Sequence, residues 1–265
     1  MTAYFDQPSW GLVLFDIDDT LVNVGGVGAQ ALVDTIAEVF GVQSPPDAVS
    51  MAGRTDAGLV MEIMARAGHS EEAVRSRLSE VWRRYPRRLA EGLRGRAPRA
   101  CPGVYELLER LGWDGRWRLG LLTGNMEAAG WLKLSAVGLQ GFFPCGAFGD
   151  EAEDRLELGP QALAAAEVVF GSPTPPEQVV VIGDTPRDVA CARGIGARAV
   201  AVATGHFSEE ALQAAAPDLV LPDLQGAQEV LARLATFLPP RPPRSARGVT
   251  PKPVRSIFAR PDWDA

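Results

Sequence analysis

The chain has 265 residues, 46% hydrophobic and 22% charged, a balance typical of a folded protein with a sizeable core. Its formal net charge of −7 argues against nucleic acid or an acidic membrane surface as a partner, and no apolar run approaches the roughly 18 residues of a membrane helix. The three cysteines are scattered and there are only two histidines, so a zinc site is not expected. Because the N-terminus also lacks a signal-peptide pattern, we expect a cytoplasmic protein.

Short apolar runs predict five buried strands, at 11–15, 117–122, 178–182, 198–202 and 218–221. Stretches with helical periodicity follow these strands at 103–112, 125–137, 159–170, 186–194, 208–215 and 223–236. Strands that alternate with helices favour an α/β fold, a doubly wound parallel sheet covered on both faces. Binding sites in such sheets lie outside the carboxyl ends of the strands. Asp16, Thr123 and Asp184 each follow a predicted strand and therefore fall at that edge.

The segment between the first two predicted strands is too long for a loop. About 80 residues separate Leu21 from Cys101, whereas structureless loops beyond about 15 residues are uncommon. Helical signals occur within it at 28–40, 55–67 and 70–91. We therefore predict a core domain at 1–23 and 99–238 and an inserted helical cap domain at 24–98. The Pro- and Arg-rich residues 239–265 lack hydrophobic periodicity and are expected to form a disordered tail.

Acidic residues next to the predicted strands point to a magnesium site. Asp16 and Asp18 are two residues apart, so their side chains can face one pocket. Two such carboxylates repel each other unless a cation joins them, and Mg²⁺ prefers oxygen ligands of this kind. Asp184 is expected to supply a further ligand. Asp188, four residues later, either binds the metal directly or supports the residues that do.

Three segments resemble signature motifs of the haloacid dehalogenase-like (HAD) hydrolase superfamily. They are FDIDDTL at 15–21, LTGN at 122–125 and IGDTPRD at 182–188. Their order, strand context and spacing match the family over residues 11–236, and the inserted helices resemble its cap domain. Phosphoglycolate-phosphatase-like members are the most similar. The resemblance implies a Rossmann-like core and a HAD-type phosphoric monoester hydrolase that uses Mg²⁺ to hydrolyse a small phosphorylated metabolite.

The resemblance also implies roles for the acidic residues. Asp16 would attack phosphorus and form an aspartyl-phosphate. Asp18 would protonate the leaving oxygen and then deprotonate the hydrolytic water. Mg²⁺, held by Asp16, the backbone carbonyl of Asp18 and Asp184, would offset charge on the transferring group.

Phosphate contacts are expected from the second motif and from the cap. Thr123 and the backbone amides of Gly124 and Asn125, before a predicted helix, would hydrogen-bond the phosphoryl oxygens. Arg54 begins a predicted cap helix and either faces the active site or lies on the surface. No cap residue identifies the substrate, and the sequence predicts no protein partner.

The third motif departs from the family pattern, which places a lysine there. Lys133 and Lys252 are the two lysines of the chain, and we expect neither to reach the site. Arg155 is the only basic residue between Lys133 and Arg187, so we predict that it stabilises charge at Asp16. The alternative for Arg155 is an ion pair with the acidic residues just before it.

Three other functions fit parts of this pattern. A sugar-phosphate mutase would use the same Asp16 and Asp18 but return the phosphoryl group to a sugar. A dehalogenase needs neither Asp18 nor a metal, and a non-catalytic binding protein of the same fold would tolerate loss of the aspartates. Because Asp16, Asp18 and Asp184 are all present, we favour the phosphatase.

Overall fold

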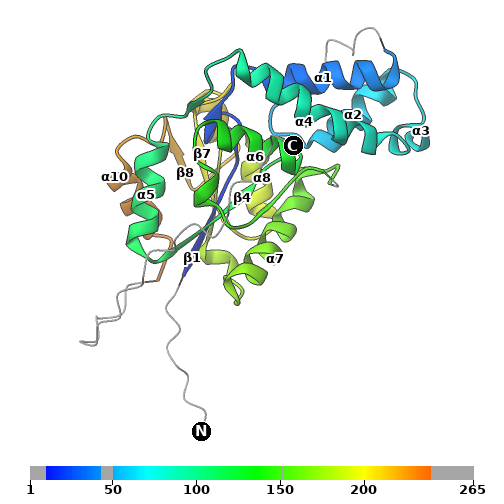
Figure 1. Ribbon diagram of the computed structural model, residues 1–265. Coiled ribbons are helices and arrows are strands. Elements are labelled where there is room, and N and C mark those ends of the chain that lie inside the picture. Colours follow the sequence, from blue (N-terminus) through cyan, green and yellow to red (C-terminus); the bar gives the residue numbers. More distant parts are fainter. Residues whose placement is uncertain (1–9, 43–49, 151, 240–265) are drawn as a thin grey trace.

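The computed structural model describes residues 10–42, 50–150 and 152–239 (Figure 1), so the predicted tail lies almost entirely outside the described residues. Within this part, the core contains a parallel sheet of six strands. Their order is β5 (Gly146–Ala147), β4 (Trp117–Leu122), β1 (Gly11–Phe15), β6 (Val179–Gly183), β7 (Arg198–Val202) and β8 (Leu219–Leu221). The predicted α/β, doubly wound parallel sheet is confirmed. The short strand β5 was not predicted.

Helices pack on both faces of the sheet because side chains alternate along each strand. In β1, Val13 and Phe15 belong to the core that includes α5 (Val104–Asp114), α6 (Glu127–Ala136) and α10 (Ala227–Ala235). Leu12 and Leu14 face the opposite core, with α7 (Leu158–Phe170), α8 (Pro186–Gly194) and α9 (Glu209–Ala214). All four side chains are completely buried, and each such burial contributes about 1.5–3 kcal/mol. Strand β1 is thereby held rigidly at the centre of the fold.

The strand order reverses at β1. From this strand the chain adds β4 and β5 on one side, then returns to add β6, β7 and β8 on the other. Loops that leave the sheet in opposite directions open a crevice at such a switch point. The N–H of Asp16 donates to the carbonyl of Ile182 at 3.0 Å, which ties the end of β1 to β6.

The helices of the insert lie together at one end of the molecule (Figure 1). The insert contains α1 (Val27–Phe40), α2 (Asp56–Arg66), α3 (Glu71–Arg75) and α4 (Leu78–Arg94). The two chain segments that join it to the core pair as antiparallel strands β2 (Val22–Asn23) and β3 (Arg99–Ala100). The boundaries predicted for the cap, 24 and 98, fall just inside this pair. That residues 24–98 behave as a separate domain stays a prediction.

The single helix predicted at 70–91 is wrong, because α3 ends before α4 begins. Ser76 lies at the break, and its hydroxyl donates to the carbonyl of Ala73 at 2.9 Å. Serine competes with helical hydrogen bonding in this way.

No helix in the described part of the chain is both long and apolar enough to cross a bilayer.

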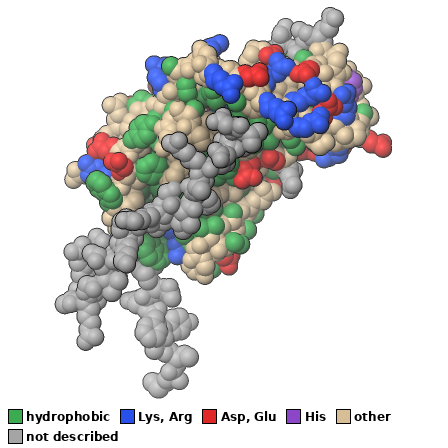
Figure 2. Space-filling view, in the orientation of Figure 1, with side chains coloured by type: hydrophobic (Ala, Val, Ile, Leu, Met, Phe, Trp, Pro, Cys, Tyr) green, Lys and Arg blue, Asp and Glu red, His purple; other side chains and the backbone are tan. Residues whose placement is uncertain are grey.

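Basic and acidic side chains gather together over the insert (Figure 2). Arg84 and Arg88 of α4 pair with Glu38 of α1, and Arg84 also contacts Glu80. These groups are 25–43% exposed, and pairs of this kind contribute about 0–1 kcal/mol each. The charged side chains of α4 are therefore largely solvated, and their ion pairs with α1 contribute little to stability.

The start of α2 is bonded to the core. The N–H of Asp56 donates to the carbonyl of Gly124 at 2.7 Å. Thr55 caps the helix by accepting from the N–H of Gly58, and its hydroxyl donates to the carbonyl of Glu153 at 2.9 Å. Gly58 lies so close that a Cβ on it would stand 2.4 Å from the Glu153 carbonyl oxygen.

We expect Gly58→Ala and Gly112→Ala to change stability in opposite directions. Alanine in a helix gains up to about 1 kcal/mol over glycine. At Gly112 of α5 no atom lies within 4 Å of an added Cβ, so this gain should appear. At Gly58 the methyl group should push α2 off the core and lower the free energy of unfolding. Urea denaturation measures both changes, and a gain at Gly58 equal to that at Gly112 would contradict the docking of α2.

Candidate active site

A cavity of about 440 Å³ lies between the carboxyl edge of the sheet and the helical insert. The core contributes six of the predicted site residues to its wall, namely Asp16, Asp18, Gly124, Asn125, Arg155 and Asp184. Arg54 lines it from the insert. Thr123 and Asp188 lie behind this wall, both buried. The structure therefore brings all nine predicted site residues into or directly behind one cavity.

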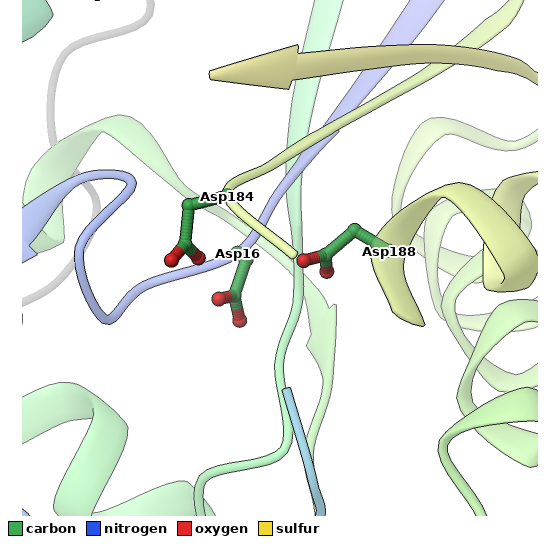
Figure 3. A group of neighbouring side chains, drawn as sticks. All are labelled: Asp16, Asp184 and Asp188. Carbon is green, nitrogen blue, oxygen red and sulfur yellow. The ribbon is translucent and has the colours of Figure 1, made fainter. Parts of the chain in front are cut away.

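Three buried aspartates converge at the end of the sheet (Figure 3). Carboxylate oxygens of Asp16, Asp184 and Asp188 all lie within 4.8 Å of one another. Burial raises the pKa of Asp16 and of Asp184 above the ordinary range, and repulsion from Asp188 raises both further. An excess of buried negative charge on oxygen atoms fits a hard divalent cation. The expected pairing of the Asp16 and Asp18 carboxylates across one cation is not seen, because the side chain of Asp18 lies outside this group and contacts Lys133. The backbone carbonyl of Asp18 stays the predicted ligand.

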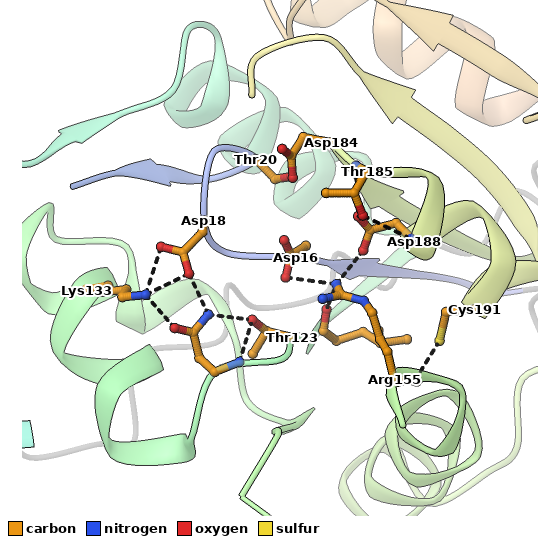
Figure 4. A network of polar contacts seen from close by, with 12 residues as sticks. Asp16, Asp18, Thr20, Thr123, Lys133, Arg155, Asp184, Thr185, Asp188 and Cys191 are labelled. Atoms are coloured by element: carbon orange, nitrogen blue, oxygen red, sulfur yellow. Dashed lines mark hydrogen bonds and ion pairs between the residues drawn. The ribbon is translucent and has the colours of Figure 1, made fainter. Parts of the chain in front are cut away.

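Arg155 lies against the aspartate cluster (Figure 4). It begins a short 3₁₀ helix, η2 (Arg155–Glu157), and is 5% exposed. Its Nη2 lies 3.0 Å from Oδ1 of Asp16 and also contacts Asp188. Burial alone would lower the pKa of Arg155, but its contacts with Asp188 and Asp16 raise it, so the guanidinium stays charged. This placement agrees with the predicted contact between Arg155 and Asp16. The buried side chain does not form the alternative, a surface ion pair with the acidic residues just before it.

Asp188 holds Arg155 in place. One of its oxygens accepts from the guanidinium, and the other accepts from the N–H and the hydroxyl of Thr185 at 3.0 and 2.7 Å. Thr185 and Asp188 form a capping box at the start of α8, which satisfies donors that the helix leaves free. Since both oxygens already accept protein hydrogen bonds, these contacts favour the supporting role for Asp188 over direct metal binding.

The expectation that Lys133 does not reach the site is wrong. Its ammonium lies 2.8 and 2.6 Å from the two oxygens of Asp18 and also donates to the side chain of Asn125 (Figure 4). Lys133 is eight residues beyond Asn125, but helical side chains point back toward the N-terminus and a lysine stem is long. One signal was available in the sequence. Lys133 follows Ala129 by four residues and precedes Leu134, so it falls on the buried stripe of α6.

Asn125 connects the second motif to Asp18. Its side-chain amide donates to Oγ1 of Thr123 at 2.8 Å and to Oδ2 of Asp18 at 2.9 Å. Its backbone N–H also donates to Oγ1 of Thr123, at 3.3 Å. The N–H of Thr123 donates to Ala147 of β5, which anchors the motif to the sheet. Thr123, Asn125, Lys133 and Asp18 thus form one hydrogen-bonded chain beside the cavity.

Arg54 lines the cavity, with its side chain paired to Glu62 of α2. Its backbone lies against Gly124, where an added Cβ would stand 1.9 Å from the Arg54 carbonyl oxygen. Glycine is therefore required at 124 for the insert to approach the second motif this closely. Of the two readings of Arg54, the one that faces the active site agrees with this placement.

Known proteins support the same family. A family model described as HAD-hydrolase-like matches residues 158–227. The chain is 29% identical over 237 residues to phosphoglycolate phosphatase from Caulobacter vibrioides, an alignment that covers 86% of this chain and 93% of the relative. It is 27% identical to the probable phosphatase IndB from Dickeya dadantii, covering 85% and 96%. A haloacid dehalogenase-like hydrolase structure from Streptococcus pneumoniae superposes with a TM-score of 0.58 at 22% identity, covering 86% and 99%.

The resemblance to HAD-like hydrolases is confirmed. The S. pneumoniae structure bears out the fold, and the family model and the two relatives bear out the family resemblance. The prediction that the chain is an enzyme, a HAD-type phosphoric monoester hydrolase, is confirmed as well, because both relatives are named phosphatases.

Asp56 is a carboxyl group at the cavity wall that sequence reasoning missed. It is the first residue of α2, 7% exposed, and accepts from the N–H of Met126 at 2.8 Å. Burial raises its pKa from an ordinary 3.8 to about 7, although Lys133 and the Met126 N–H act in the opposite direction. An aspartate at a helix start has a common structural use, which is why the sequence did not single it out.

Asp56 should make stability depend on pH. Between about pH 4 and pH 7 the folded protein keeps a proton on Asp56 that the unfolded chain releases, so its contribution to stability falls as pH rises. Asp56→Asn cannot ionise but still accepts from Met126. Its free energy of unfolding should therefore increase relative to wild type across this window, by on the order of 4 kcal/mol at most. Urea denaturation at several pH values measures this difference, and a difference that stays constant with pH would contradict the raised pKa.

Proposed function

We propose that this chain is a magnesium-dependent phosphatase that hydrolyses a small phosphomonoester through an aspartyl-phosphate on Asp16. The observation that carries the proposal is the position of Asp16. It directly follows the central strand β1 at the switch point and lines the cavity, and its Oδ1 lies 3.0 Å from Nη2 of Arg155. A carboxylate there can attack a phosphorus atom that enters from the cavity, with a cationic group beside it to stabilise the added charge.

The aspartate cluster fits Mg²⁺ by its donor set. Asp16 and Asp184 offer buried carboxylate oxygens at the cavity wall, and Arg155 alone does not balance the three aspartates. We propose that Asp16, the backbone carbonyl of Asp18 and Asp184 hold the ion, with Asp188 behind them. Bound Mg²⁺ would offset negative charge on the transferring phosphoryl group.

Asp16 and Asp18 would have different roles in the reaction. An oxygen of Asp16 forms a bond to phosphorus while the bond to the alcohol oxygen breaks, and Asp18 gives that oxygen its proton. Asp18 next takes a proton from water, whose oxygen attacks the phosphorus and releases Asp16 and inorganic phosphate. Asp18 suits this exchange because its side chain is 43% exposed at the cavity, whereas Asp16 is nearly buried. Lys133 and Asn125 hold Asp18 from the side.

Other groups orient the phosphoryl group. We propose that the amide of Gly124 and the guanidinium of Arg155 contact its oxygens, while the buried Thr123 supports Asn125 from behind the cavity wall. Arg54 would act from the insert, on either the phosphate or the rest of the substrate. Phosphoglycolate, which the C. vibrioides relative is named for, is one candidate substrate. The mutase is the alternative that experiment must separate from the phosphatase. Residues 24–98 would act as a cap that covers the bound substrate.

Asp16→Asn should abolish phosphate release. The amide keeps the shape of the side chain but cannot attack phosphorus, so turnover should fall by at least about a thousandfold. The measurement is inorganic phosphate released from a panel of phosphomonoesters with Mg²⁺ present. Asp34→Asn, on the exposed part of α1, is the matched control and should retain wild-type turnover. Phosphoryl transfer between sugar positions without phosphate release would instead identify a mutase.

Magnesium should stabilise the folded protein through the aspartate cluster. A ligand that binds only the folded state at a hundred times its Kd adds about 2.7 kcal/mol, so Mg²⁺ should raise the unfolding temperature of wild type. Asp184→Asn removes one ligand oxygen charge and should lose most of this rise, even without substrate. Thermal unfolding in EDTA and in Mg²⁺ tests this. An equal rise in Asp184→Asn and wild type would place the metal elsewhere.

A further inference from the structure

Tyr85 is a polar residue of the cavity wall that the proposed reaction does not use. Tyr85 lies on α4, is 1% exposed, and lines the same cavity as Asp16 and Asp18. Among the described residues its hydroxyl has no hydrogen-bond partner. Buried tyrosine hydroxyls normally find one. Because the side chain lines the cavity, a bound ligand can supply this missing partner.

Tyr85 lies on the side of the cavity where the alcohol part of a substrate would sit. The Tyr85 oxygen and the Lys133 ammonium lie 3.8 and 2.8 Å from the position of a Cβ on Gly28. Lys133 in turn holds Asp18, which faces the leaving oxygen in the proposed mechanism. The hydroxyl therefore lies on the same side of the cavity as Lys133 and Asp18, the group that faces the leaving oxygen in the proposed mechanism.

The surroundings of Tyr85 select the kind of atom it can bind. Burial raises the pKa of its hydroxyl well above the ordinary value, and Asp56 and Asp18 raise it further, so the group is a hydrogen-bond donor. The nearby ammonium of Lys133 already donates to Asp18 and Asn125. The ligand atom that binds Tyr85 must therefore be a hydrogen-bond acceptor, such as an oxygen of the substrate.

We propose that Tyr85 selects substrates by donating a hydrogen bond to a hydroxyl or carbonyl oxygen on the alcohol part of the phosphomonoester. This inference rests on the proposed phosphatase function. It makes Tyr85 a specificity-determining residue contributed by the helical insert. Val24, Ala29, Leu32 and Leu59 add apolar side chains to the cavity lining, and the volume of about 440 Å³ suits a small substrate.

The test compares Tyr85→Phe with wild type on two esters that differ by one hydroxyl, propyl phosphate and 2-hydroxypropyl phosphate. The variant should lower kcat/KM for the hydroxylated ester about tenfold, the effect of one lost hydrogen bond. Its kcat/KM for propyl phosphate should stay within about twofold. The folded state should be no less stable, because no existing hydrogen bond is removed. Tyr105→Phe, which removes an exposed hydroxyl on α5 outside the cavity, should change neither ester.

Two results would overturn the inference. Equal losses on both esters would make Tyr85 a structural residue, and no loss on either would show that its hydroxyl does not touch the substrate. Both results leave the phosphatase proposal standing, provided that Asp16→Asn abolishes hydrolysis of these esters. If wild type hydrolyses neither ester nor any other phosphomonoester of the panel, both proposals fail together.

Discussion

The fold concentrates negative charge where water is scarce, and the rest of the site depends on how this charge is balanced. Asp16, Asp184 and Asp188 meet at the end of two central strands, and raised pKa values for Asp16 and Asp184 record the cost of placing them there. Arg155 balances only part of this charge. The remainder favours a cation. Removing the arginine would leave buried carboxylates unpaired, a change that typically costs about 3–5 kcal/mol.

A second group of charges joins the core to the helical insert. Lys133 holds Asp18 and Asn125, which come from the loops after β1 and β4. It also acts on Asp56 at the start of α2, whose carboxyl accepts from the backbone of the second motif. The same small region thus positions the proposed acid–base group and fixes the insert. The same contacts therefore link the position of Asp18 to the position of the insert that borders the cavity.

The two groups differ in their solvent exposure, and this difference suits different tasks. The cluster around Asp16 is buried, so its ionic contacts are rigid and little screened. Asp18 is 43% exposed and reaches the cavity, where it can exchange protons with a leaving group and with water. Tyr85 adds a neutral donor on that more open side. In the proposed mechanism the insert would select the substrate, and the residues at the end of the sheet would carry out the reaction.

Sequence analysis predicted the features that depend on local pattern. Apolar runs located five strands of the core, and the residues that follow them gave Asp16, Thr123 and Asp184, because parallel strands expose their carboxyl ends at one edge. Arg155 was found because basic residues are scarce near it. The split between α3 and α4 and the two-residue strand β5 were missed, since one serine side chain and two residues leave too weak a pattern.

The sequence by itself determined the fold class and placed Asp16 and Asp184 together, because both results follow from periodicity and from residues adjacent to strands. Only the tertiary structure decided the partners of the long side chains. Lys133 reaches Asp18 by lying back along α6, and Tyr85 faces the cavity because α4 packs across the insert. Such contacts join residues that are distant along the chain. Their distances depend on how helices pack, which no local pattern encodes.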